Sequence, residues 1–340
     1  MPHQKKMNIT VLGAGAWGTA LAISLASKNK VVLWGRNQVA MQEADQAREN
    51  HHYLPGYALP EALEVSSDFD YALRHALPDD SEGLLIIASS VSGLRPLLQQ
   101  CKHLPLKNVV WLCKGFEEST RLLPHQIVEQ ELGSQVLAGA LSGPSFAQEV
   151  AQGLPCALTI ASKSNALCQL VVQAAHSQAL RVYSSDDLAG VEVGGAVKNI
   201  MAIATGVADG LGLGLNARAA LMTRGLAEIS RLCLALGGKH ETLMGLTGVG
   251  DLILTCTGNL SRNRRVGLAL AEGKSLDTII QELGHVAEGV RCAQAVQGLA
   301  HELNVEMPIT DAVAGVLFDG VPARKMIEKL LARNAKVETH

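Results

Sequence analysis

Aromatic residues and clustered metal ligands are scarce in this sequence of 340 residues. Phe, Trp and Tyr together make up 3% of it, and no two histidines form an H-x-x-x-H pair. The seven cysteines are odd in number and never closer than twelve residues apart, which excludes C-x-x-C zinc or redox motifs and argues against a disulfide framework. We therefore expect free, buried thiols, typical of a reducing cytoplasm, and no metal site.

A large excess of one charge is missing as well. The formal net charge is −3, and the chain contains no long block of like charges. This balance does not suit a protein that binds nucleic acid or an anionic membrane over a broad surface. The one basic cluster, Arg262-Asn263-Arg264-Arg265, lacks interleaved aromatic residues, so we prefer a local anion site there to a nucleic-acid patch.

An uncharged run of nineteen residues, 9–27, raises the alternative of a membrane span or a signal peptide. Its interior favours another structure, because a strand-like stretch is followed by three glycines and then by an Ala- and Leu-rich stretch from Thr19. Each glycine costs a helix roughly 1 kcal/mol relative to alanine. Strand, turn and helix therefore fit the run better than a single span.

Short aliphatic runs alternate with helical stretches up to about residue 188, and long helical segments follow. Continuous apolar strands are typical of a parallel sheet covered on both faces. We predict an α/β fold, with a Rossmann-like doubly wound sheet domain over residues 1–188 and an all-α domain over residues 189–340. The expected strands are 8–12, 31–34, 84–88, 109–113, 136–140 and 157–161; the expected helices are 94–101, 122–132, 165–176, 190–208, 217–236, 261–272, 288–303 and 322–333; segment 45–60 is irregular and 183–187 marks the boundary.

The glycines after the first strand follow the pattern Gly13-x-Gly15-x-x-Gly18. Between a strand and a helix, this pattern indicates a dinucleotide site, although a purely structural turn is the alternative. Gly13 permits the tight turn, Gly15 lets the backbone approach a pyrophosphate, and Gly18 lets the helix pack on the strand. The first N–H groups of the helix would hold the phosphates.

The end of the second strand bears on the choice of dinucleotide. NAD sites usually place Asp or Glu there, whereas this strand ends in Trp34-Gly35-Arg36. Arg36 suits a 2′-phosphate, so we prefer NADP to NAD without excluding NAD. The alternative is that Arg36 is only a solvated loop residue.

Isolated polar residues in small-residue segments are the candidates for chemistry. Lys114 and the Gly143-Pro144-Ser145 segment follow strands, where open α/β sheets place ligand groups. Lys198 shares a helix side with Gly194 and Gly195, and we expect it to pair with Asp251, supported by Asn199 and Thr255. A surface lysine is the alternative for Lys198.

The predicted phosphate site is the start of the helix expected over residues 261–272. Ser261 suits an N-cap, and arginine in the first turn opposes the helix dipole. A bound anion would relieve that cost, so we expect Arg262 to grip a phosphate.

Six strings in this order resemble bacterial NAD(P)-dependent glycerol-3-phosphate dehydrogenases, and the similarity runs from about residue 7 to 333. The family often has Ser at position 16, where this chain has Ala. The broader β-hydroxyacid dehydrogenases have Asn four residues after the lysine; here Asn199 follows Lys198 directly, which favours the narrower family. The strings are Gly13-Ala14-Gly15-Ala16-Trp17-Gly18-Thr19-Ala20, Leu33-Trp34-Gly35-Arg36, Ser142-Gly143-Pro144-Ser145-Phe146-Ala147, Gly194-Gly195-Ala196-Val197-Lys198-Asn199, Gly250-Asp251-Leu252 and Ser261-Arg262-Asn263-Arg264.

The resemblance implies reversible hydride transfer between NAD(P)H and dihydroxyacetone phosphate, with Lys198 as the proton acceptor in glycerol 3-phosphate oxidation. It also implies two sets of contacts. The cofactor set comprises Ala16, Trp17, Arg36, Lys114, Ala147, Arg262, Val286 and Glu288, and the substrate set comprises Lys114, Gly143, Ser145, Lys198, Asp251, Ser261, Arg262 and Asn263.

Two other functions remain open at this point. One is a related dehydrogenase of the β-hydroxyacid or 6-phosphogluconate type acting on another small hydroxy compound. The other is a nucleotide-sensing module without chemistry, against which the intact Lys198, Asp251 and Arg262 argue. The resemblance implies a cytoplasmic role in supplying the glycerol backbone of phospholipids. The charge balance argues against a nucleic-acid partner, the glycines within the run 9–27 argue against a membrane span, and a homodimer is compatible with these expectations.

Overall fold

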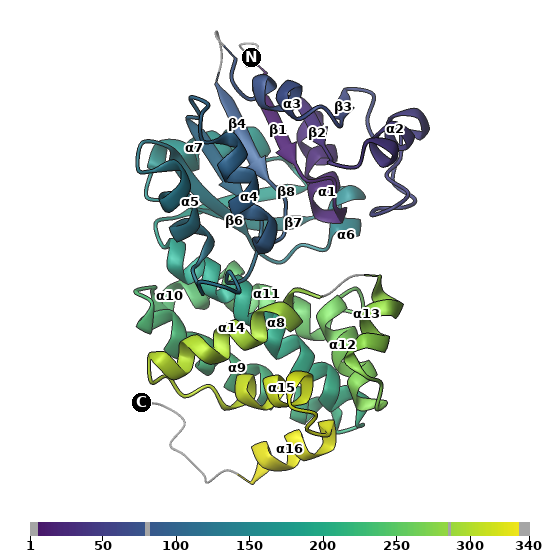
Figure 1. Cartoon of the computed structure of the whole chain (residues 1–340), viewed down its shortest axis with the longest axis vertical. Coiled ribbons are helices and arrows are strands. Elements are labelled where there is room, and N and C mark those ends of the chain that lie inside the picture. The colour runs from purple at the N-terminus through teal and green to yellow at the C-terminus, as the bar shows by residue number, and fades with distance from the viewer. Residues whose placement is uncertain (1–5, 79–81, 285–286, 333–340) are drawn as a thin grey trace. The chain divides into compact units, whose positions relative to one another are not determined.

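The computed structural model describes residues 6–78, 82–284 and 287–332 (Figure 1). The chain divides into two compact units, one of residues 1–114 and 122–192 and the other of residues 115–121 and 193–340. The division falls inside helix α8 (Leu188–Gly210), and the short segment 115–121 is grouped with the second unit.

The first unit is built on an eight-stranded sheet in the order β3-β2-β1-β4-β5-β6-β7-β8. Neighbouring strands are parallel except β6 and β7, which are antiparallel, so the sheet is mostly parallel, in keeping with the doubly wound prediction. The strands are β1 (Asn8–Leu12), β2 (Lys30–Trp34), β3 (Leu63–Ser66), β4 (Gly83–Ile87), β5 (Asn108–Trp111), β6 (Leu137–Ser142), β7 (Cys156–Ala161) and β8 (Leu180–Ser185).

The two strands that the sequence did not reveal, β3 and β8, lie at the edges of the sheet. Edge strands carry more polar residues than central ones, so the long apolar run that identified the others is missing. Residues Tyr183 to Ser185, the first part of the expected boundary segment 183–187, end β8.

Helices cover both faces of this sheet, as the doubly wound prediction requires (Figure 1). Because side chains alternate along a strand, Ile9 and Val11 of β1 pack into the core on one face, while Leu12 joins the core on the other. All three are fully buried. The helices are α1 (Ala16–Ala26), α2 (Gln38–Ala47), α3 (Phe69–His75), α4 (Val91–Cys101), α5 (Pro124–Leu132), α6 (Ala147–Ala151) and α7 (Asn165–Ala175).

The second unit is helical in every regular element over residues 193–284 and 287–332, which confirms the predicted all-α character. The structure contains five helical elements that the sequence had not indicated here: α10, η1, α11, α13 and α15. After α8, the elements are α9 (Gly214–Ala235), α10 (His240–Leu243), the π-helix η1 (Leu246–Gly250), α11 (Asp251–Thr257), α12 (Arg262–Ala271), α13 (Leu276–Leu283), α14 (Glu288–Glu302), α15 (Pro308–Phe318) and α16 (Ala323–Leu331).

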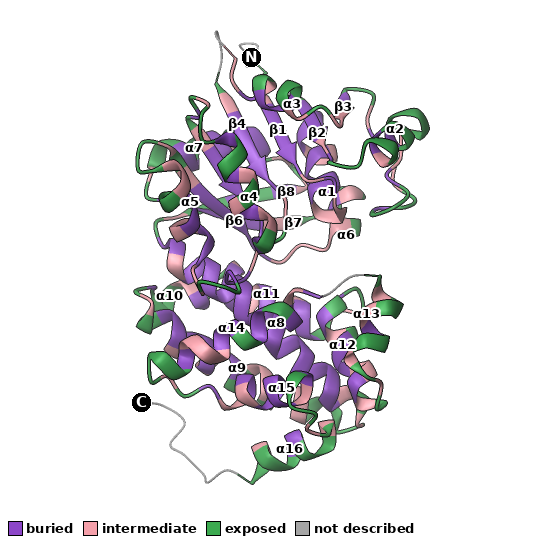
Figure 2. Ribbon diagram, viewed as in Figure 1, coloured by how far each residue is buried: buried purple, intermediate pink, exposed green. Residues whose placement is uncertain are grey.

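Helix α8 is the most buried long helix of the chain (Figure 2). Its length and apolar composition would suffice for a membrane span, but its apolar window is wholly buried within the fold, as in the core helix of a globular domain. The run 9–27, for which a span was the alternative, forms β1, the glycine turn and α1.

Other helices approach α8 at glycines that leave no room for a side chain. A Cβ on Gly194 would lie 2.5 Å from the carbonyl oxygen of Thr247, and one on Gly206 would lie 2.2 Å from that of Arg264. Helices α8 and α12 cross at Gly206, and on the α12 side of this crossing a Cβ on Gly267 would lie 2.1 Å from the Ile203 oxygen. The second unit therefore depends on direct contact between helix backbones.

A first prediction follows from this packing. Gly206→Ala should destabilise the protein by about 1–3 kcal/mol, because the added methyl group overpacks the α8–α12 crossing. The matched control is Gly315→Ala in α15, where the nearest atom to a built Cβ is 3.4 Å away. That variant should be neutral or gain up to about 1 kcal/mol from helix propensity. Equal urea-unfolding midpoints for the two variants would contradict the prediction.

A buried carboxyl group on α9 caps the start of α15. Glu228 accepts hydrogen bonds from the backbone N–H groups of Ile309 (2.7 Å) and Thr310 (3.2 Å). Burial raises the pKa of Glu228 to about 7, although these hydrogen bonds and nearby Arg231 oppose the rise. The cap is a contact between distant segments, so no local pattern in the sequence indicated it.

A second prediction concerns pH. Since the folded-state pKa of Glu228 exceeds its ordinary value, the folded protein binds the proton more tightly than the unfolded chain does. The contribution of Glu228 to the free energy of unfolding should fall by up to about 3 kcal/mol as pH rises from about 4.5 to about 7. Glu228→Gln should remove this part of the pH dependence in urea unfolding. A variant that keeps the wild-type pH dependence would show that another group causes it.

Candidate active site

The first unit brings several predicted ligand residues to one edge of its sheet. Strands β1, β2, β4, β5 and β6 run parallel, so their carboxyl ends share this edge. The glycine turn follows β1, Arg36 follows β2, Lys114 follows β5, and Gly143 follows β6. Open α/β sheets bind ligands at this edge.

The glycine turn has the shape that a dinucleotide needs. Gly13 has a φ of +125°, and a Cβ there would lie 2.6 Å from the carbonyl oxygen of Ala88. A Cβ on Gly18 would lie 2.0 Å from the Gly13 oxygen, whereas one on Gly15 would meet nothing within 4 Å. Gly13 and Gly18 are thus fixed by packing, and Gly15 leaves the open space into which a pyrophosphate fits.

The start of α1 adds the donors for such an anion. Gly15 is the N-cap of this eleven-residue helix and has no side chain to cap it, and no acidic residue stands in the first turn. Ala16 and Trp17 begin the helix, so their N–H groups and the positive end of the helix dipole are available to phosphate. The residues present therefore fit NAD or NADP.

Arg36 is exposed just beyond β2. The adjacent Asn37 caps α2, since its side chain accepts from the Ala40 N–H group at 3.1 Å. The exposed guanidinium keeps both sequence-based interpretations open, a 2′-phosphate ligand and a solvated loop residue.

Lys114, Gly143 and Ser145 lie together in the first unit. The Gly143 carbonyl oxygen accepts from Lys114 Nζ at 3.2 Å and from Ser145 Oγ at 3.1 Å. Gly143 has a φ of +141°, a conformation that favours glycine. Ala147, the predicted cofactor contact, begins α6 directly after this segment and is half-buried.

The second unit contains a buried ion pair. Lys198 Nζ contacts Asp251 Oδ1, with Lys198 5% exposed and Asp251 1% exposed. Asp251 begins α11, which continues directly from η1. Thr255 Oγ1 donates to the Asp251 backbone oxygen at 2.6 Å and lies 3.4 Å from Asp251 Oδ1. Buried charges are costly unless paired, so this arrangement marks a candidate for acid–base chemistry.

Asn199 does not take the supporting role that the sequence suggested. Its amide bonds to Gly195 and Glu288, and its Oδ1 accepts from Asn263 Nδ2 at 2.9 Å. Asn263 Oδ1 in turn accepts from the Gly289 N–H group at 2.9 Å. This network ties α8, α12 and the start of α14 together. Asn263, predicted to contact substrate, is therefore also a structural link.

The start of α12 is built as expected. Ser261 is the N-cap and accepts from the Arg264 N–H group at 3.2 Å, while Arg262 is the exposed first residue of the helix. Arg264, however, turns to Asp209 at the end of α8, which it contacts through Nε at 2.9 Å and Nη2 at 2.8 Å. Arg218 of α9 binds the other oxygen of Asp209 at 2.8 Å. No pattern in the sequence indicated this Asp209 clamp, in which Arg264 and Arg218 bind the two carboxylate oxygens of Asp209.

Of the remaining predicted residues, Val286 lies outside the described residues and Glu288 begins α14 as a partner of Asn199. Among residues 6–78, 82–284 and 287–332, no group of three or more His, Cys, Asp or Glu side chains could hold a metal ion.

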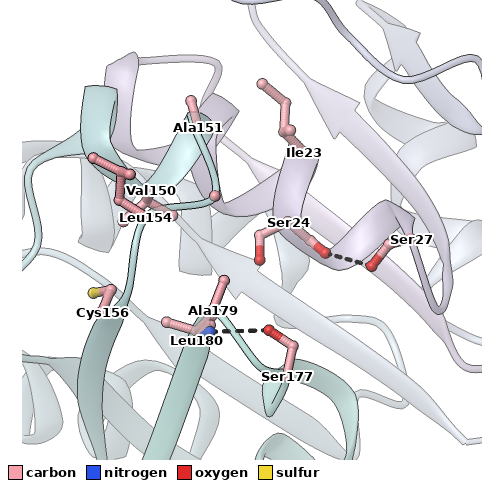
Figure 3. A pocket seen from close by; sticks show the side chains of 11 residues that line it. Ile23, Ser24, Ser27, Val150, Ala151, Leu154, Cys156, Ser177, Ala179 and Leu180 are labelled. Carbon is pink, nitrogen blue, oxygen red and sulfur yellow. Dashed lines mark hydrogen bonds between the residues drawn. The ribbon is translucent and has the colours of Figure 1, made fainter.

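A separate small pocket lies in the first unit, among α1, the end of α6 and the starts of β7 and β8 (Figure 3). Its lining is mostly apolar with three serines, and none of the predicted site residues lines it. Cys156, at its wall, is half-buried and lies 3.3 Å from the Pro144 oxygen. The other six cysteines are buried, and none of the seven, all of which lie within the described residues, forms a disulfide. The pocket is therefore not the predicted site.

Comparison with known proteins gives a consistent result along the whole chain. Residues 8–168 match the model for the N-terminus of NAD-dependent glycerol-3-phosphate dehydrogenase, and residues 187–328 match the model for its C-terminus. Glycerol-3-phosphate dehydrogenase [NAD(P)+] from Herminiimonas arsenicoxydans is 65% identical over 332 residues, covering 98% of this chain and 99% of that protein. The relative from Paucimonas lemoignei is 65% identical over 333 residues, with the same coverage.

Solved structures agree. The crystal structure of glycerol-3-phosphate dehydrogenase from Coxiella burnetii superposes with a TM-score of 0.91 at 42% identity, covering 98% of this chain and all of that one. D-mandelate dehydrogenase, at 16% identity and a TM-score of 0.57, shares the fold alone. The predicted fold class and family resemblance are thereby confirmed: the chain belongs to the NAD-dependent glycerol-3-phosphate dehydrogenase family.

Proposed function

We propose that this chain catalyses the reversible conversion of dihydroxyacetone phosphate and NAD(P)H to sn-glycerol 3-phosphate and NAD(P)+. The observation that carries the proposal is the buried pair of Lys198 and Asp251, held in a unit that matches the family over residues 187–328. When bound, the nicotinamide ring donates or accepts the hydride.

Each of the two domains expected from the sequence is assigned one main role. The domain of residues 1–188 binds the dinucleotide, and the domain of residues 189–340 binds the substrate. The open space at Gly15 and the uncapped start of α1 support the first assignment. The proposed cofactor contacts are Gly13, Gly15, Ala16, Trp17, Gly18, Arg36, Lys114, Ala147, Arg262, Val286 and Glu288, with NADP preferred because of Arg36.

Lys198 is the proposed acid and base. In reduction, its ammonium group polarises the ketone and donates a proton as the alkoxide forms, and in oxidation the neutral amine accepts a proton from the hydroxyl group. Asp251 orients the amine through their direct contact, and Thr255 fixes Asp251 in turn.

The phosphate group of the substrate, which is remote from the reacting carbon, is proposed to orient the substrate. Binding at the start of α12 would place the reacting carbon and add affinity in the transition state. The proposed substrate contacts are those that the resemblance implies: Lys114, Gly143, Ser145, Lys198, Asp251, Ser261, Arg262 and Asn263.

We place this activity in the cytoplasm, where it supplies the glycerol backbone of phospholipids. The seven cysteines support that location, since they form no disulfide within the described residues and reducing compartments keep thiols reduced. A homodimer is compatible with this role.

A third prediction tests the lysine. The oxidation rate should peak at higher pH than the reduction rate, because a lysine in water titrates near ~10.4 and must lose its proton before it can accept one. Lys198→Arg keeps the charge beside Asp251 but cannot act as a base. It should lower both rates by about 100-fold or more, while NADPH binding, followed by fluorescence, stays unchanged. Coincident pH optima in the wild type, or an active arginine variant, would count against this role.

A fourth prediction tests the phosphate site. At saturating NADPH, Arg262→Ala should raise the KM for dihydroxyacetone phosphate about 10- to 100-fold, because a hydrogen bond to a charged group contributes about 1.5–3 kcal/mol. The control is Arg265→Ala, an exposed arginine one position beyond Arg264 with no assigned role. The kcat/KM for unphosphorylated dihydroxyacetone should not change in either variant. If Arg262→Ala and Arg265→Ala have the same KM for dihydroxyacetone phosphate, the phosphate binds elsewhere.

A further inference from the structure

The irregular stretch between α2 and β3, residues 48–62, has no part in the proposed chemistry, yet it inserts a polar side chain beneath the glycine turn. Asn50 is 3% exposed. Its Nδ2 donates to the Ala14 carbonyl oxygen at 2.8 Å and to Thr19 Oγ1 at 2.9 Å. Its Oδ1 accepts from the Tyr53 N–H group at 3.3 Å.

The Ala14 carbonyl group is significant because of its position. It stands between Gly13 and Gly15, in the turn whose N–H groups are to hold an anion. A carbonyl oxygen turned toward a pyrophosphate would repel it, whereas N–H groups attract it. The Asn50 amide holds this oxygen, and by also binding Thr19 it fixes the turn to the first part of α1.

The stretch that carries Asn50 is itself firmly anchored. Leu54 is 1% exposed and packs with Ala20 of α1 and Val150 of α6. Glu49 Oε1 accepts from the Gly56 N–H group at 2.7 Å. The position of the amide is therefore set by the core of the first unit, independently of any ligand.

We propose that Asn50 is a positioning residue for the dinucleotide: it touches no part of the cofactor, and it sets pyrophosphate affinity by holding the Ala14 carbonyl group away from the anion. This inference rests on the proposed function, since it requires a dinucleotide at the glycine turn. It assigns to residues 48–62 a role in cofactor affinity and none in the phosphate site of the substrate.

Asn50→Asp is the sharpest test, because it keeps the shape of the side chain and replaces the donor with an acceptor. In this variant the affinity for NADPH, measured by fluorescence titration, should fall about tenfold or more, as expected for a lost buried hydrogen bond and a new repulsion. Binding of adenosine 2′-monophosphate, which lacks the pyrophosphate, should stay within about twofold. The KM for dihydroxyacetone phosphate should not change.

The chain offers a matched control at the other end of α1. Asn29 is 6% exposed, and its Nδ2 likewise donates twice, to Leu25 O and Ala174 O, both at 3.0 Å. Asn29→Asp should lower stability without changing NADPH affinity. Asn50→Ala serves as a second variant, which introduces no charge, and should weaken NADPH binding in the same direction.

The outcomes separate this inference from the proposed function. Equal NADPH affinities in the Asn50 and Asn29 variants, or equal losses for NADPH and adenosine 2′-monophosphate, would overturn the role of Asn50 alone. A wild-type protein that binds neither NADPH nor NADH would overturn both proposals. A selective loss for NADPH in Asn50→Asp or Asn50→Ala supports the inference.

Discussion

Direct contact between helix backbones is the constraint on which the second unit depends. At Gly194 and Gly206 of α8, carbonyl groups from η1 and α12 approach so closely that no Cβ fits. These two contacts lie on either side of Lys198 along the helix. They fix the elements that carry Asp251 and Arg262, because α11 continues directly from η1 and Arg262 is in the first turn of α12. Because a packed interior does not deform continuously, these backbone contacts leave η1 and α12 little freedom to move relative to α8.

The sequence predicted the features that depend on neighbouring residues. The glycine turn, the helix from Arg262 to Ala271 and its Ser261 cap carry local signals, and the structure contains each of them. Pairing of Lys198 with Asp251 could be expected only because a buried charge needs an opposite one. Val286 lies outside the described residues, so its predicted contact stays a prediction.

What the sequence could not reveal are contacts between distant segments. Asp209 holds Arg264 from 55 residues away, and Glu228 caps a helix that begins 80 residues later. Asn50 lies in a stretch that looks merely irregular, yet it reaches the turn after β1. None of these has a periodicity or spacing that would identify it. Polar side chains that act across the fold are visible only once the fold is known.

The Asp209 clamp has a consequence for how the protein responds to its ionic medium. The side chains of Asp209 and Arg264 are only 7% and 12% exposed, so dissolved salt screens their attraction weakly. Arg262, two residues before Arg264, is exposed, and counter-ions reach it freely. Rising ionic strength would therefore weaken the phosphate binding proposed for Arg262 well before it weakens the contact between Asp209 and Arg264 that holds α12.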